Sequence, residues 1–190
     1  MFFSKALIAS KTVTPFPEPK LPTSKIDIQG LISLGDWIWN SSGIVSLPND
    51  TTTYEFDATG VHVGDAAQTQ LGLMVRYEPI KRLYFKVRTV YFGKNFSDFN
   101  PETLEGETGG RESWKMPNYG LVNFHTGYGF KIQKADVRFN LNILNVFDTM
   151  YISDATNNDG FNNPNYGTFD AKSASVFFGQ GRRWNLSMQI

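Results

Sequence analysis

The sequence predicts an all-β fold of about seven or eight long antiparallel strands. Three observations favour this class. Apolar and polar residues alternate with a period of two in several stretches, as from Leu71 to Tyr77, which is typical of strands with one apolar and one polar face. These stretches exceed the roughly five or six residues usual in soluble sheets. Finally, the connections between them are alternately short and long along the 190-residue chain.

Composition excludes several other classes of protein. The formal net charge is +0 and the pI is about 6.7, so the chain lacks the basic character of a nucleic-acid-binding domain. Cysteine is absent, which excludes disulfides and thiolate metal sites. No apolar run approaches the ~18–20 residues of a membrane helix, whereas a membrane strand needs only ~9–11 residues.

The first third of the chain predicts two strands and two loops. Four prolines between residues 15 and 22 indicate a loop, and residues 25–34 then alternate as a strand. Gly35-Asp36 is expected to be a turn, leading to a second strand that carries Trp37 and Trp39 and runs toward Leu47. Residues 48–66 form a long polar stretch, with a short strand expected near Tyr54–Phe56.

The middle of the chain gives the strongest alternation. Residues 71–78 are expected to pair through a tight turn at Pro79–Arg82 with a long strand that reaches about Phe96. A polar loop at 97–117 precedes a strand over 122–132. A second tight turn at Gln133–Asp136 leads into a strand over 137–143.

The chain is expected to end in a strand. After an Asn- and Gly-rich loop at 154–172, the stretch from Val176 to Ile190 closes the sequence. In it, Arg183, Asn185, Ser187 and Gln189 alternate with the apolar residues Trp184, Leu186, Met188 and Ile190.

Long strands joined by tight turns at one end and long loops at the other are typical of a transmembrane β-barrel. The apolar face would then contact lipid, and the polar face would line a wet interior. The polar face comprises Arg76, Lys86, Arg88, His125, Lys131, Arg138, Asn140 and Asn142. The same pattern fits a soluble β-sandwich or a lipocalin-like module, with the apolar face inward, and periodicity alone leaves both open.

A more specific signal lies at Leu141–Asp148. With Tyr151, this stretch resembles the Asn-Leu-Phe-Asp-x-x-Tyr signature near the C-terminus of TonB-dependent outer-membrane receptors, with Val146 in place of leucine. The corresponding residues are Asn145, Phe147, Asp148 and Tyr151. Trp114, Pro117 and Tyr119 resemble the Trp-x-x-Pro-x-Tyr element of Bacteroidetes-type members. Gly181-Arg182-Arg183 resembles the family's Gly-x-Pro-Arg element.

The resemblance covers roughly residues 20–190 and implies a bacterial outer-membrane location. These receptors have barrels of about 22 strands filled by a plug. Residues 1–190 are therefore expected to be the C-terminal part of such a barrel, without the plug. The implied function is uptake of a scarce nutrient of the siderophore, cobalamin or glycan type. The implied partners are the lipid bilayer, the barrel-assembly machinery, the remaining barrel and plug and, indirectly, the TonB complex.

The implied topology makes Gly35-Asp36, Pro79–Arg82 and Gln133–Asp136 periplasmic turns. The loops at 15–22, 48–66, 97–117 and 154–172 would be extracellular. Trp184, Leu186, Met188 and Ile190 would form the C-terminal assembly signal, although family members usually end in an aromatic residue. The alternative is a stand-alone eight-stranded outer-membrane barrel with a structural role.

No enzymatic, cofactor or metal site is expected. The sequence contains no nucleophile elbow, phosphate-binding loop or zinc-peptidase motif. His62 and His125 are the only histidines and have no ligand-like spacing to each other, and His125 is expected on the polar face. For Asn145 and Asp148 the favoured interpretation is structural, because Asn and Asp side chains readily bond nearby backbone at strand ends.

Overall fold

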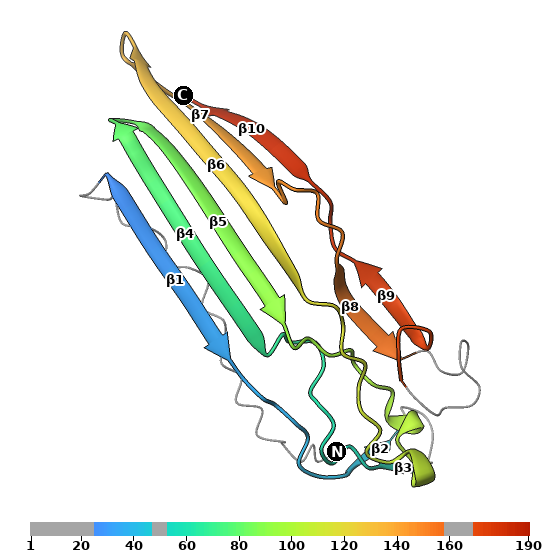
Figure 1. Cartoon of the computed structure of the whole chain (residues 1–190). Helices are drawn as coiled ribbons and strands as arrows, with labels where there is room; N and C mark the ends of the chain where they lie inside the picture. Colours follow the sequence, from blue (N-terminus) through green and yellow to red (C-terminus); the bar gives the residue numbers. More distant parts are fainter. Residues whose placement is uncertain (1–24, 47–52, 158–168) are drawn as a thin grey trace.

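A computed structural model describes residues 25–46, 53–157 and 169–190 (Figure 1). The described part is all-β, and its strands pair antiparallel. Six strands form one sheet in the order β1-β4-β5-β6-β7-β10. Their bounds are Ile26–Leu34 for β1, Thr69–Ile80 for β4, Leu83–Gly93 for β5, Tyr119–Ile132 for β6, Ala135–Leu144 for β7 and Arg183–Gln189 for β10.

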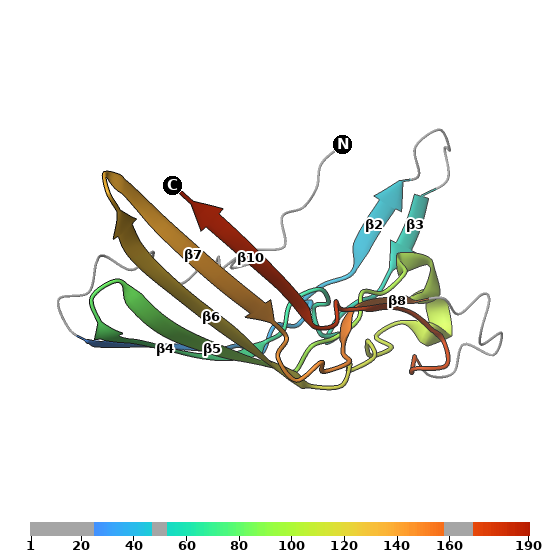
Figure 2. The same cartoon turned by 90° about the horizontal axis from the view of Figure 1, so that it is seen from above.

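The six-stranded sheet is curved into a trough (Figure 2). Two short pairs, β2 (Gly43–Ser46) with β3 (Thr53–Phe56) and β8 (Ile152–Asn157) with β9 (Ala174–Phe178), lie beyond one end of it. Two 3-10 turns, η1 (Pro101–Thr103) and η2 (Gly106–Thr108), lie at the same end. We call this end, formed by the connections β1–β4, β5–β6 and β7–β10, the loop end.

Short and long connections alternate, as predicted. The opposite end of the sheet, the turn end, has only the tight turns β4–β5 and β6–β7. Each of these turns contains one residue with positive φ, Arg82 at 73° and Gln133 at 54°. A left-handed residue lets a two-residue connection reverse the chain in step with the twist of the strands.

The predicted turn at Gly35-Asp36 is wrong, and so is the second strand through Trp37 and Trp39. Strand β1 pairs with β4, so that Ile26 lies opposite Tyr77, and Gly35 begins one of the three long connections. Gly35-Asp36 therefore lies at the loop end, not among the tight turns. The chain between β1 and β4 pairs with itself as β2 and β3, which confirms the short strand expected near Tyr54–Phe56.

The predicted closing strand is divided in two. Its first part, β9, pairs with β8, and only β10 joins the main sheet. Strand β8 overlaps the start of the stretch expected to be a loop at 154–172. The break includes Gly179, where an added Cβ would lie 1.9 Å from the Tyr151 ring, so this position must be glycine. The described residues thus contain ten strands instead of seven or eight. The predicted loop at 15–22 lies outside the described residues.

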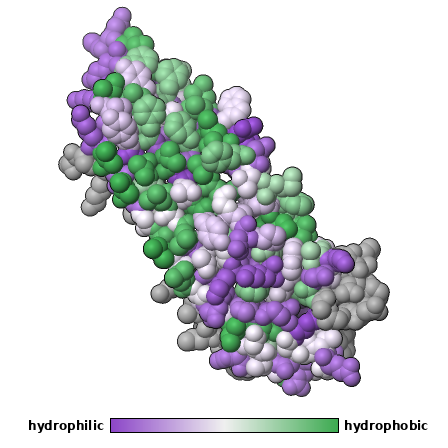
Figure 3. All heavy atoms as spheres, viewed as in Figure 1, coloured by the Kyte–Doolittle hydropathy of each residue, from purple (hydrophilic) through white to green (hydrophobic). Residues whose placement is uncertain are grey.

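The buried core lies at the loop end. It consists of Phe56, Ala58, Val61, Phe99 and Leu104, with Trp39 and Val45 packed against it. The edge of the Trp39 ring meets the Phe99 ring at a centroid distance of 5.8 Å. The main sheet instead carries its apolar residues on its convex side, where they gather over the strands in the view of Figure 3.

Candidate functional site

The apolar face of the main sheet is continuous from edge to edge. Strand register aligns the apolar positions of neighbouring strands, so the alternation in each strand falls on the same side. One row across all six strands consists of Ile28, Val75, Val87, Phe124, Ile143 and Trp184. The next row toward the turn end is Ile26, Tyr77, Phe85, Thr126, Leu141 and Leu186.

The burial of side chains on the two faces is the reverse of that in a soluble sheet. Ile28 is 64% exposed and Trp184 is 74% exposed, although both are large and apolar. On the opposite face Met74 is 4% exposed, and the Arg76 side chain is 18% exposed. Contiguous apolar surface of this extent marks a partner or a membrane in native proteins.

The polar face carries every residue that the sequence assigned to it. One row across the six strands consists of Asp27, Arg76, Lys86, His125, Asn142 and Asn185. Arg76 forms an ion pair with Glu78 at 3.1 Å, and its guanidinium lies 4.5 Å from the centroid of the Tyr84 ring. Both contacts lie on the concave side of the sheet.

The C-terminal strand places its apolar residues on the apolar face. Trp184, Leu186 and Met188 lie opposite Ile143, Leu141 and Phe139 of β7. Ile190 follows the last residue of the strand and is 81% exposed. Within the described residues β10 pairs only with β7, so its other edge is open. The same holds for β1, which pairs only with β4.

Asn145 fixes the end of β7. It is 4% exposed with φ of 50°, and its Oδ1 accepts a hydrogen bond from the Thr149 backbone N–H at 2.9 Å. Its Nδ2 donates to the backbone carbonyls of Thr149 at 2.9 Å and Gln180 at 3.2 Å. The side chain therefore ties the segment after β7 to the segment before β10.

Asp148 makes the second tie. Its Oδ1 accepts a hydrogen bond from the Arg182 backbone N–H at 2.6 Å, and its φ is 55°. An added Cβ at Gly181 would lie 2.9 Å from the same oxygen, so a side chain there would crowd the bond. The motif at 145–151 and the element at 181–183 thus meet in space, as parts of one junction.

The two aromatic motif residues have different surroundings. The Tyr151 ring stacks on Tyr119 at a centroid distance of 4.4 Å, and Tyr119 in turn contacts Phe92 at 5.1 Å. Phe147 is 74% exposed, so its ring takes no part in the junction.

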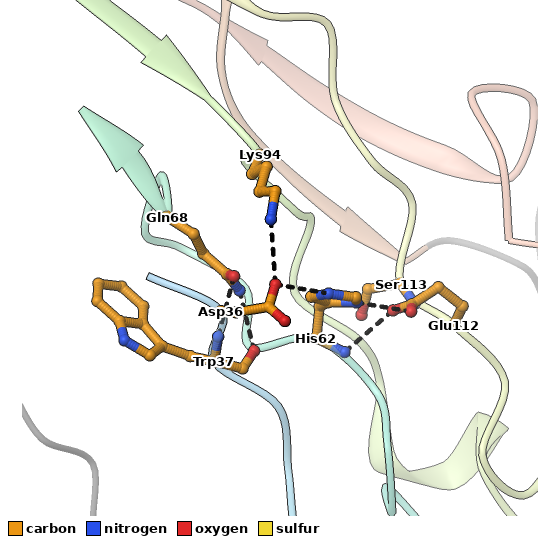
Figure 4. Close-up of polar contacts among 7 residues, drawn as sticks. All are labelled: Asp36, Trp37, His62, Gln68, Lys94, Glu112 and Ser113. Carbon is orange, nitrogen blue, oxygen red and sulfur yellow. Dashed lines mark hydrogen bonds and ion pairs between the residues drawn. The ribbon is translucent and has the colours of Figure 1, made fainter. Parts of the chain in front are cut away.

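A polar network joins two of the long connections at the loop end (Figure 4). The His62 ring lies between two carboxylates: its Nδ1 is 2.7 Å from Glu112 Oε2 and its Nε2 is 3.7 Å from Asp36 Oδ1. The His62 backbone N–H also donates to Glu112 Oε1 at 3.0 Å. The ring stacks flat on Phe96 at 4.1 Å. The network is built from the β1–β4 and β5–β6 connections.

Gln68 and Lys94 position Asp36 in this network. The buried Gln68 side chain accepts from the Trp37 backbone N–H and donates to its carbonyl, both at 2.9 Å, which fixes the residue next to Asp36. Lys94 Nζ donates to Asp36 Oδ1 at 3.2 Å. That hydrogen bond and the positive charge of the ammonium lower the pKa of the Asp36 carboxyl below its usual value.

Three carboxylates, one from each long connection, meet nearby. Partial burial raises the pKa of Asp65 to about 6, and the negative charges of Asp98 and Asp154 add to the rise. The Asp98 backbone N–H donates to the Ala155 carbonyl at 2.9 Å, which holds the β5–β6 connection against β8. Among the described residues no group of three or more His, Cys, Asp or Glu side chains is arranged to hold a metal ion.

Sequence reasoning missed the loop-end network. Its members, Asp36, His62, Lys94 and Glu112, are up to 76 positions apart and carry no shared spacing. His62 is one of only two histidines in the sequence, and nothing in the sequence identified its partners. The polar face and the strand-end motif were, in contrast, found from local pattern.

No protein-family model matches the chain, and no curated protein matches it. In the described part of the chain, no helix is long and apolar enough to cross a membrane. Among solved structures, the chain is similar to the crystal structure of the ferric-catecholate import receptor Fiu from E. coli K12 in its closed form, with 13% sequence identity and a TM-score of 0.47. The match covers 87% of this chain and 18% of that receptor, so the chain spans less than a fifth of its length.

Proposed function

We propose that this chain forms part of the wall of an outer-membrane transport barrel. Its apolar face would contact lipid and its polar face would line the interior. The observation that carries the proposal is the unbroken, exposed apolar face of the six-stranded sheet, with charged residues confined to the other face. A soluble sandwich would need a second layer over this face, and among the described residues none covers it.

The height of the apolar face fits a bilayer. On β5 the outward residues run from Leu83 to Tyr91, a stretch of nine residues. At ~3.3 Å per residue this is roughly 30 Å along the strand. A tilt of ~40°, usual in membrane barrels, reduces it to roughly 23 Å, close to the ~25 Å apolar band of such barrels.

The open edges favour a part of a larger barrel over a stand-alone barrel of eight strands. An isolated small barrel must pair its first and last strands, because an open edge in lipid leaves backbone groups without hydrogen bonds. Here β1 and β10 are separated by four strands and do not pair with each other. Additional strands, supplied by the remainder of a receptor barrel, would satisfy both edges.

The transport role and its partners come from the sequence resemblance to TonB-dependent receptors. On that basis the solute would be a scarce nutrient of the siderophore, cobalamin or glycan type. The chain would supply wall and extracellular loops, while a plug and the TonB complex would supply gating and energy. The outward residues of β10 would be recognised by the barrel-assembly machinery, and no catalytic role is proposed.

Single cysteines on β10 test the lipid contact directly. The chain has no cysteine, so Leu186→Cys on the apolar face and Ser187→Cys on the polar face each introduce one unique thiol. Both positions are exposed in the structure, so both would react in a soluble protein. In lipid vesicles we expect a water-soluble maleimide to label Ser187→Cys and to spare Leu186→Cys. In urea both thiols should react equally, which provides the reference for full labelling. Equal labelling of the two thiols in vesicles would refute the lipid contact.

The transport role has its own test. Deleting the chain from the outer membrane of its source bacterium should slow growth when iron, cobalamin or a glycan is the limiting nutrient. Restoring the chain should restore growth on the same nutrient. Unchanged growth under all three limitations would favour the purely structural alternative.

A further inference from the structure

An open hollow of about 440 Å³ lies on the polar face where β6, β7 and β10 meet. It is lined by His125, Asn142, Leu144, Arg183, Trp184 and Asn185. A smaller hollow of about 150 Å³ adjoins it and shares Leu144 and Arg183. Arg183 thus borders both spaces, at the loop end of β10.

The hydrogen bonds behind the hollow run in one direction. Asn142 Oδ1 lies 2.7 Å from His125 Nδ1 and can only accept, so the imidazole donates this bond. Asn142 Nδ2 then donates to Asn185 Oδ1 at 2.9 Å. Because its oxygen is the acceptor, Asn185 is left with the two N–H groups of its amide for another partner.

The free groups in the hollow are therefore donors. In the part of the chain that the structure describes, neither Asn185 Nδ2 nor the Arg183 guanidinium has a hydrogen-bond partner in the protein. An arginine presents five N–H donors in a planar fork that matches two oxygens of a carboxylate or phosphate. None of the described residues that line the hollow is acidic.

The polar face as a whole carries more positive than negative side chains, like the hollow. The charged residues of the six strands number six basic and three acidic. The basic residues are Arg76, Lys86, Arg88, Lys131, Arg138 and Arg183, and the acidic ones are Asp27, Glu78 and Asp136. Lys86 lies directly opposite His125 in the strand register, beside the hollow. Such a surface attracts anions from solution.

We propose that this hollow binds a small anion through a carboxylate or phosphate group. The Arg183 guanidinium would hold two anion oxygens side by side, and the Asn185 amide would donate a further hydrogen bond. The His125–Asn142 pair would fix the orientation of the Asn185 amide and would not touch the anion. The site is formed by this chain alone and does not depend on whether the apolar face contacts lipid.

The test is calorimetric titration of the full 190-residue chain, folded in detergent micelles, with citrate and separately with inorganic phosphate. Glucose serves as the uncharged control. We expect saturable binding of at least one anion, and the preference between them distinguishes carboxylate from phosphate. Arg183→Gln should weaken binding by at least about tenfold, because it removes a charge-assisted pair of hydrogen bonds.

Arg182→Gln is the matched control. It removes the same charge one residue earlier, but the Arg182 guanidinium donates to the Val146 carbonyl at 3.4 Å and does not line either hollow. Binding should be unchanged in this variant and lost in Asn185→Asp, which replaces a donor with a negative charge. Absence of saturable binding, or equal weakening by Arg182→Gln and Arg183→Gln, would overturn the proposal. Circular dichroism of each variant shows whether the fold is retained.

Discussion

The main sheet and the loop end place their apolar residues in opposite ways. In the sheet, large apolar side chains such as Ile28 and Trp184 point outward and are exposed, while polar side chains lie on the sheltered concave side. At the loop end, Leu104 and Val61 are 1% and 0% exposed and lie inside a small core. The sheet therefore leaves its large apolar side chains exposed, whereas the loop end encloses them. Under the proposed function, lipid would cover the apolar face of the sheet and water would surround the loop end.

The two regions also differ in how they are held together. The sheet is held by backbone ladders whose partners are set by strand register. The loop end is held by side chains and by isolated backbone bonds between connections, such as Asp57 N–H to the Leu104 carbonyl at 2.9 Å. Local sequence pattern can specify the strands of the sheet. The structure of the loop end depends instead on contacts between residues that are distant in the sequence.

The largest expected effect is on the outward face of β10. Leu186→Lys combined with Met188→Lys would place two charges in the apolar face, each costing ~2–4 kcal/mol near the centre of a bilayer. We expect the double variant to fail to insert, measured by loss of heat-modifiable migration and of protease resistance in membranes. Ser187→Lys with Gln189→Lys, on the other face of the same strand, should insert normally. If both double variants insert alike, the two faces do not differ in their surroundings.

A second pair of variants replaces leucine with alanine, once in the buried core of the loop end and once on the apolar face of the sheet. Leu104→Ala leaves a cavity in the buried core and should cost about 3 kcal/mol. Hydrogen exchange should then accelerate at the loop end, for example at the Asp57 and Gly110 amides that bond across this core. Leu73→Ala on the apolar face leaves no closed cavity, because Leu73 is 45% exposed, and its effect should be smaller. Equal acceleration in both variants would contradict the distinction.

The third prediction concerns the junction between the regions. Asn145→Ala should cost about 2 kcal/mol, because it removes three hydrogen bonds to backbone from a buried site. The urea midpoint of the folded chain measures the cost. Asn145→Asp keeps the acceptor for the Thr149 N–H, but it places a carboxylate oxygen against the Thr149 and Gln180 carbonyls in a buried site, so its midpoint should be as low as that of Asn145→Ala or lower. If the urea midpoint of Asn145→Ala equals that of the wild type, Asn145 does not stabilise the fold.

The smallest effect is a pH dependence confined to the loop end. The Asp65 pKa is raised to about 6 from an ordinary value of 3.8, so the folded state favours the protonated carboxyl. Its contacts are therefore most stable below about pH 4 and weaken as the pH rises through 6. Asp65→Asn should slow loop-end hydrogen exchange at pH 7, by roughly 1 kcal/mol or less because the side chain is partly in solvent. An identical pH profile in the variant would exclude Asp65 as the source.

Local pattern was sufficient for the strands and their faces. The alternation from Leu71 to Tyr77 and from Leu83 to Tyr91 matches β4 and β5, and the tight turns lie where proline and charged residues interrupt it. The polar face, including His125, follows because each residue in a strand points opposite to the next. The structural interpretation of Asn145 and Asp148 came from the known preference of these residues for backbone partners.

Pairing between distant segments was not predictable in the same way. Neighbouring strands in sequence usually pair, so the alternation at 25–34 was expected to fold back at Gly35-Asp36. The actual partner of β1 begins at Thr69, and the intervening chain folds on itself because Phe56 and Val61 find a core with Phe99 and Leu104. The donors Arg183 and Asn185 are adjacent polar positions in a strand, and only the direction of the Asn142 amide identifies them as a pair.

The main sheet has an even number of strands, and this affects how such a chain could be joined to other strands. With six antiparallel strands, β1 and β10 run in opposite directions, and the chain enters β1 and leaves β10 at the same turn end. A segment of this kind could be inserted into an antiparallel barrel, duplicated, or supplied as a separate polypeptide. In each case the directions of the neighbouring strands would stay the same. In the proposed barrel, none of its loops would need to change sides of the membrane.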